Sequence, residues 1–97
     1  MANVNEADLK YQSVGDNSFF EIKALTSQQL EIFNLTFGGA CELYKTNGTT
    51  DILVETFTQS GGLFNYKLFV SDTIYYRIKN KSGATKYFGY EGVRIVW

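Results

Sequence analysis

Residues 40–58 read ACELYKTNGTTDILVETFT, and this stretch decides the fold class. Asn47-Gly48 lies between two segments, 40–45 and 50–58, that are rich in residues favoured in β-strands. An Asn-Gly pair in this setting is a strong signal of a β-hairpin, because both residues tolerate a positive φ angle. The stretch therefore predicts two antiparallel strands joined by a tight turn at Asn47-Gly48.

The segments on either side of this hairpin also alternate apolar and polar residues with a period of two, which is typical of half-buried strands. A change of parity at Ile32-Phe33 predicts a β-bulge there. Gly38-Gly39 predicts a sharp corner or a second bulge, and Gly61-Gly62 predicts a turn. The further strands are predicted at 20–24, 30–37, 64–70, 74–79 and 86–97.

About seven strands at a spacing of roughly 8–12 residues predict an all-β protein. We expect a small antiparallel β-sandwich, immunoglobulin-like or jelly-roll-like, with a small barrel as the alternative. A chain of 97 residues can fill one core. Residues 1–13 are polar and are predicted to form an N-terminal arm or a single helical turn, so that 14–97 make the single β-sandwich domain.

The composition argues against enzymatic chemistry. The chain has no histidine, and Cys41 is its only cysteine, so a disulfide within the chain, a Cys–His nucleophile and a Cys/His metal site all lack their residues. No phosphate-binding or calcium-binding loop is present. We expect no catalytic site, no metal and no cofactor. Cys41 lies between Ala40 and Leu43, and we expect it to be buried and unreactive.

The N-terminal residues carry neither a basic flank nor an apolar run, so no secretory signal is predicted. No stretch approaches the ~20 apolar residues of a membrane span. We therefore expect a cytoplasmic protein, or one that is assembled into a particle after cytoplasmic synthesis.

Charge is unevenly distributed along the chain. Residues 1–60 contain three lysines and eight acidic residues, a balance of −5, whereas residues 61–97 contain six basic and two acidic residues, a balance of +4. If the two halves formed different surfaces, the molecule would have an acidic and a basic side, which would favour head-to-tail contacts. If strands from the two halves interleave, the asymmetry cancels in space.

Aromatic residues are abundant towards the C-terminus. Tyr75 shares the strand parity of Arg77 and Lys79, which makes it a candidate for exposure. Exposed Tyr and Trp side chains stack on sugars, on bases or against a partner protein. The structural alternative is that these aromatics fill the core, which we expect for Phe64 and Tyr76. The candidate binding residues are Tyr75, Arg77, Lys79, Tyr87, Tyr90 and Trp97.

These features favour a non-enzymatic structural or binding module that acts through its surface. The leading hypothesis is a self-associating or assembly subunit, such as a small virion or adhesive component, by analogy of architecture with the sandwich modules of phage virions. The alternative is a carbohydrate-binding module that uses exposed Tyr and Trp side chains. A net charge of −1 and a pI near 5.3 argue against a nucleic-acid partner.

Overall fold

The computed structural model describes residues 7–64 and 67–96. Residues 1–6 of the predicted arm, residues 65–66 of a predicted strand and the candidate binding residue Trp97 lie outside this part of the chain. The described residues contain no helix, and therefore none long and apolar enough to cross a membrane. They form nine strands: β1 (Ala7–Val14), β2 (Phe19–Ile22), β3 (Gln29–Phe37), β4 (Cys41–Thr46), β5 (Asp51–Phe57), β6 (Gly61–Leu63), β7 (Leu68–Ser71), β8 (Tyr75–Asn80) and β9 (Lys86–Val96).

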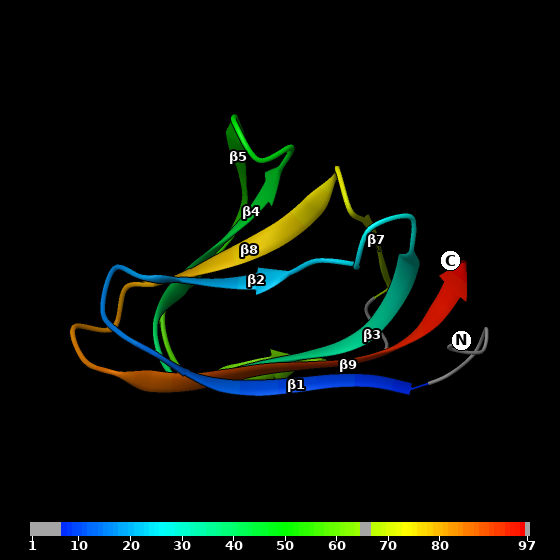
Figure 1. The fold of residues 1–97 in the computed structure, drawn as a ribbon. Helices are drawn as coiled ribbons and strands as arrows, with labels where there is room; N and C mark the ends of the chain where they lie inside the picture. The colour runs from blue at the N-terminus through cyan, green and yellow to red at the C-terminus, as the bar shows by residue number, and fades with distance from the viewer. Residues whose placement is uncertain (1–6, 65–66, 97) are drawn as a thin grey trace.

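The strands form two antiparallel sheets packed as a sandwich, as predicted (Figure 1). The five-stranded sheet has the order β1-β9-β3-β6. Its fifth strand, β7, also pairs with β3. The four-stranded sheet has the order β2-β8-β4-β5. The β4–β5 hairpin extends away from the five-stranded sheet, so that no second layer covers its tip (Figure 1).

The core lies between the two sheets and is made of the inward-facing residues of both. Phe20 from β2 packs against Phe88 and Tyr90 from β9, with ring centroids 6.3 and 6.1 Å away. The buried apolar residues are Val14, Phe20, Ile22, Ala24, Leu30, Ile32, Leu35, Phe37, Cys41, Leu43, Leu68, Val70, Tyr75, Ile78, Phe88 and Tyr90.

Two irregularities predicted from the sequence occur where expected. The register between β3 and β9 shifts between Ile32 and Asn34, which confirms the bulge at Ile32-Phe33. Leu30 and Ile32 before the shift, and Leu35 and Phe37 after it, are all buried. Gly38-Gly39 forms the corner at which the chain leaves β3 for β4 in the opposite sheet.

Three expectations were wrong. Residues 7–14, assigned almost entirely to a polar arm, form β1 and pair with β9 along their whole length. Residues 61–63, expected to include a turn, form the strand β6, which pairs with β3. Phe64, expected in the core, is 67% exposed, because β6 ends at Leu63 before the chain reaches the next strand. Tyr76, in contrast, is partly buried against the core.

The predicted Asn47-Gly48 hairpin is present and joins β4 to β5. Thr46 pairs with Asp51, so residues 47–50 form the loop. Gly48 alone in this loop has a positive φ angle, +91°. Asn47 acts through its side chain instead: its Oδ1 accepts hydrogen bonds from the backbone N–H groups of Thr49 and Thr50 at 2.9 and 2.8 Å.

The positive φ angle of Gly48 leads to a stability prediction. We expect Gly48→Val to lower the free energy of unfolding by about 1–3 kcal/mol, because a β-branched side chain is strained in this conformation. The control Gly48→Asn should cost less, since Asn tolerates positive φ. Urea unfolding of the three proteins measures both effects. Equal stability of the valine variant and the wild type would contradict the prediction.

The charge asymmetry of the sequence cancels in the folded molecule. The basic strands β8 and β9 come from the second half of the chain, yet each lies between two strands of the first half. Cross-strand ion pairs follow from this arrangement: Arg77 with Glu21 at 3.2 Å and Arg94 with Asp8 at 3.7 Å. The idea of one acidic and one basic side is therefore wrong, and a head-to-tail contact driven by charge loses its basis.

Candidate functional site

The structure divides the predicted binding residues between different surfaces. Tyr75, Arg77 and Lys79 lie on β8 of the four-stranded sheet, and Tyr87 and Tyr90 lie on β9 of the five-stranded sheet. Tyr87 and Tyr90 themselves point to opposite faces of their sheet: Tyr87 is 53% exposed and Tyr90 is buried. The five candidates that lie in the described part of the chain therefore do not form one site.

Arg77 is the centre of a charged and aromatic cluster on the four-stranded sheet. Its guanidinium lies 3.2 Å from the Glu21 carboxylate and 3.7 Å from that of Asp51. It also lies 4.9 Å from the centre of the Phe19 ring. Burial alone would lower the pKa of Arg77, but its hydrogen bond with Tyr75 and the charge of Asp51 outweigh burial and raise it.

Tyr75 was predicted to be exposed, and it is only 5% exposed. The cations around it account for the difference: the Lys23 ammonium lies 4.8 Å from its ring centre, and Arg77 Nη2 donates to its hydroxyl at 3.3 Å. Lys79, half-buried, lies 5.6 Å from the centre of the Phe19 ring. These side chains contact one another, so we interpret the cluster as one that stabilises the fold.

Tyr90 was also a candidate for exposure, and it points into the sandwich. Its hydroxyl donates to Asp8 Oδ1 at 3.1 Å. Burial, followed by the charge of Asp8, raises the pKa of Tyr90. The exposed tyrosine of this strand, Tyr87, stacks on Tyr11 of β1 with ring centroids 4.8 Å apart and an angle of 17° between the rings.

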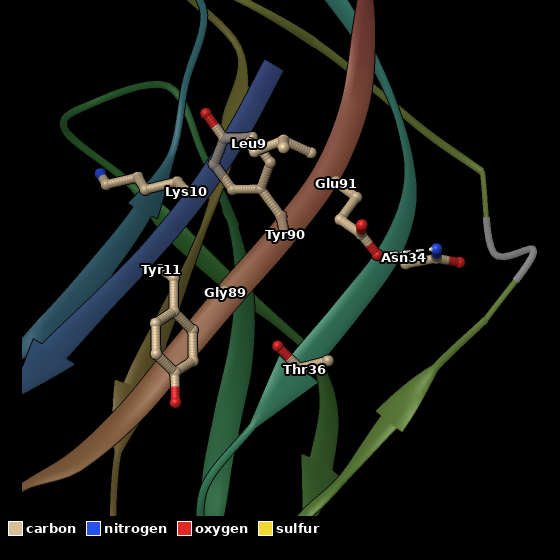
Figure 2. A pocket seen from close by; sticks show the side chains of 8 residues that line it. All are labelled: Leu9, Lys10, Tyr11, Asn34, Thr36, Gly89, Tyr90 and Glu91. Atoms are coloured by element: carbon tan, nitrogen blue, oxygen red, sulfur yellow. Dashed lines mark hydrogen bonds between the residues drawn. The ribbon is translucent and has the colours of Figure 1, made fainter. Parts of the chain in front are cut away.

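The outer face of the five-stranded sheet carries a depression (Figure 2). Its floor follows from strand register. Gly89 on β9 pairs with Tyr11 on one side and with Thr36 on the other. Since Gly89 has no side chain, the sheet surface is hollow between the larger side chains of its neighbours. We call this site the Gly89 depression; its lining residues are Leu9, Lys10, Tyr11, Asn34, Thr36, Gly89, Tyr90 and Glu91.

Glycine is required at position 89 by close approach rather than by its φ angle. A Cβ atom there would stand 2.8 Å from the backbone oxygen of Lys10 and 3.0 Å from Thr36 Oγ1. It would also stand 3.2 Å from the Tyr11 ring. The tight packing on both sides therefore keeps the floor of the depression free of a side chain.

The next row across the sheet forms a polar wall. Glu91 pairs with Leu9 and with Asn34, and Asn34 Nδ2 donates to Glu91 Oε1 at 3.1 Å (Figure 2). Lys10 contributes no charge, because its Nζ is directed to the other face of β1, where it donates to the Glu21 backbone oxygen at 3.1 Å. The open volume is about 440 Å³, within the range typical of small-molecule sites.

Sequence reasoning missed this depression because Leu9 and Tyr11 were assigned to the polar arm. A signal was present: Leu9 and Tyr11 alternate with Asp8, Lys10 and Gln12, a period of two. The pairing with β9 turns that alternation into an outer face with Leu9 and Tyr11 65% and 73% exposed.

The edge of the four-stranded sheet is a second exposed surface. β5 pairs with β4 on one side, and no described strand pairs with its other side. Its consecutive residues Ile52, Leu53 and Val54 are 64%, 50% and 42% exposed. Exposure extends to both faces because the hairpin projects beyond the opposite sheet (Figure 1).

Cys41 is buried, as predicted, with 1% exposure. Burial, followed by the charge of Glu42, raises the pKa of its thiol to about 12. The reactive thiolate is therefore scarce near neutral pH. Low reactivity towards a thiol reagent in the native state stays a prediction.

Comparison with known proteins places the fold but not the family. No protein-family model matches the chain, and no curated protein sequence matches it. Among solved structures, it is similar to Drosophila NLP-core, whose crystal structure was described for its insight into pentamer formation and histone binding. The TM-score is 0.51 at 10% sequence identity, over 93% of this chain and 99% of that one. At this identity the likeness shows a shared sandwich fold.

Proposed function

We propose that this protein is a non-enzymatic structural module that associates with copies of itself, and that the free edge of β5 is the contact between copies. The observation that carries the proposal is the run Ile52, Leu53 and Val54, exposed on a strand whose outer edge has no partner among the described residues. An edge of this kind is a template for pairing with another chain.

Features that protect edge strands are only partly present on β5. Its register with β4 shifts beside Val54, which indicates a bulge, and Asp51 and Glu55 place carboxylates near the two ends of the aliphatic run. Bulges and charges both discourage indiscriminate pairing. The aliphatic residues between them remain uncovered, an arrangement that favours one specific partner over general aggregation.

The shared fold with NLP-core supports self-association, since that protein was studied for pentamer formation. In this proposal the chain is a repeated subunit of a larger assembly, such as a virion or an adhesive structure, and it is made and assembled in the cytoplasm. The contact is apolar rather than ionic, because the charges of the two halves of the chain neutralise one another within each molecule.

The proposal predicts a defined oligomer in solution. We expect light scattering coupled to size exclusion to give a multiple of the monomer mass, with little change as salt is raised, because an apolar contact is not screened. The double variant Ile52→Lys/Val54→Lys should be monomeric. It should keep the circular dichroism spectrum of the wild type, since both side chains are exposed in the monomer.

The control is Phe69→Lys, which also places a lysine at an exposed apolar position, on β7 of the other sheet at an exposure of 62%. It should leave the oligomer intact. A wild type that is monomeric at every concentration would refute self-association. An oligomer that survives the β5 double variant would show that the contact lies elsewhere.

A further inference from the structure

The Gly89 depression combines an exposed aromatic side chain with polar side chains that form hydrogen bonds. Tyr11 provides an aromatic surface that is 73% exposed. Thr36, Asn34 and Glu91 provide a hydroxyl, an amide and a carboxylate on the floor and the opposite wall (Figure 2). The aromatic ring can stack on an apolar surface of a ligand, and the polar groups can form hydrogen bonds with it in several directions.

Tyr87 holds the Tyr11 ring in place from outside the depression. The two rings stack at 4.8 Å, and Tyr87 does not line the depression. One face of Tyr11 is therefore supported by Tyr87, and the side chain still remains 73% exposed. A ring that is braced in this way loses little conformational entropy when a ligand covers its free face.

The hydrogen-bonding groups are also oriented before any ligand arrives. The bond from Asn34 Nδ2 to Glu91 Oε1 joins the two side chains across neighbouring strands. It uses one of about four acceptor positions of the carboxylate, so Glu91 can accept further hydrogen bonds. Thr36 lies in the adjacent row across the sheet and presents its hydroxyl on the exposed face.

The charge of the depression selects among ligands. Among the described residues that line the depression, only Glu91 directs an ionised group into the space, since the Lys10 ammonium lies on the other side of β1, 5.0 Å from the centre of the Phe20 ring. A lone carboxylate repels phosphates and acidic sugars. A neutral sugar ring fits the remaining chemistry: its C–H face covers an aromatic ring, and its hydroxyl groups donate to carboxylate and hydroxyl oxygens.

We infer that the Gly89 depression is a binding site for a neutral oligosaccharide, with Tyr11 as the stacking surface and Thr36, Asn34 and Glu91 as the hydrogen-bonding groups. The site lies on the five-stranded sheet and the proposed β5 contact on the four-stranded sheet. The inference is therefore independent of self-association and can fail or succeed without it.

The test is a titration of the ¹⁵N-labelled protein with four hexasaccharides (cellohexaose, maltohexaose, chitohexaose and mannohexaose), followed by ¹H–¹⁵N correlation spectra. We expect at least one sugar to give saturable shifts centred on the amides of Thr36, Gly89 and Glu91. Tyr11→Ala should weaken binding of that sugar by about tenfold, as expected for loss of an aromatic contact. Phe69→Ala, an exposed aromatic on the same sheet outside the depression, should bind like the wild type.

Because Tyr11 also packs over Gly89, its removal could disturb the fold. Thr36→Val provides a second variant, which keeps the shape of the side chain and removes only the hydroxyl, and it too should weaken binding. Three results would each overturn the inference: no shifts with any of the four sugars, shifts that map to another surface, or wild-type affinity in both Tyr11→Ala and Thr36→Val.

Discussion

Replacing Asn80 with alanine is expected to lower the free energy of unfolding by about 3–4 kcal/mol, the largest effect that we predict for one side chain. Asn80 is completely buried at the end of β8. Its Nδ2 donates to the backbone oxygens of Val14 and Ala84 at 2.9 and 2.8 Å. Its Oδ1 accepts from the backbone N–H and the hydroxyl of Ser82 at 2.9 and 2.7 Å.

The size of the effect follows from what the substitution leaves behind. Alanine would remove the amide that donates to Val14 O in a buried position and the oxygen that accepts from Ser82 N, whereas Ala84 O would keep its hydrogen bond from the Ser82 hydroxyl at 2.9 Å. An unpaired buried polar group costs about 1–3 kcal/mol. Asn80 also joins the end of β1 to the turn between β8 and β9, so the substitution would remove a connection between the two sheets.

Chemical denaturation of Asn80→Ala, with Gln59→Ala as the control, measures this effect. Gln59 carries an exposed amide, and its loss should change stability by no more than about 0.5 kcal/mol. If Asn80→Ala were as stable as the control, the hydrogen bonds of Asn80 would contribute nothing to stability, and our interpretation of this residue would be wrong.

Arg77→Ala is expected to lower the free energy of unfolding by about 2 kcal/mol. The estimate combines two partly buried ion pairs, with Glu21 and Asp51, and the contact with the Phe19 ring, each of about 0.5–1 kcal/mol. The side chain of Arg77 is 18% exposed, so its partners are only partly screened by water. Removal would also uncover Tyr75 and leave two carboxylates without their shared cation.

Arg77→Met separates the two contributions, because methionine keeps most of the packing over Phe19 and Tyr75 and removes the charge. We expect the methionine variant to lie between the wild type and the alanine variant in thermal and urea unfolding. A ligand-binding role for Arg77 would give the opposite pattern. In that case Arg77→Ala would unfold like the wild type, and the structural interpretation of the cluster would fail.

Much of the local structure could be predicted because its causes are local. The period of two in residues 30–37, the parity change at Ile32-Phe33 and the Asn47-Gly48 turn each depend on a few neighbouring residues. The burial of Cys41 followed from its apolar neighbours. The role of Asn47 was only partly predicted, because the sequence does not show whether its side chain or its φ angle shapes the turn.

Exposure of the aromatic residues could not be predicted from parity alone. Tyr75 does share a parity with Arg77, but the side chains of Lys23 and Arg77 cover it. Tyr90 was a candidate for the surface, and its ring lies in the core beside Phe20. Parity assigns a residue to one face of a strand, whereas coverage of that face depends on side chains that come from distant parts of the chain.

The sequence by itself determined that this chain forms short antiparallel strands around one core, because alternation and turn chemistry act over a few residues. Only the tertiary structure decided which strands are neighbours. The Gly89 depression unites residues 9–11, 34–36 and 89–91, and it exists because the registers of β1, β9 and β3 align Tyr11, Gly89 and Thr36 in one row. The exposed edge of β5 likewise depends on how far the hairpin reaches past the opposite sheet. Both surfaces arise from long-range pairing and layer packing, for which no local stretch of sequence carries the information.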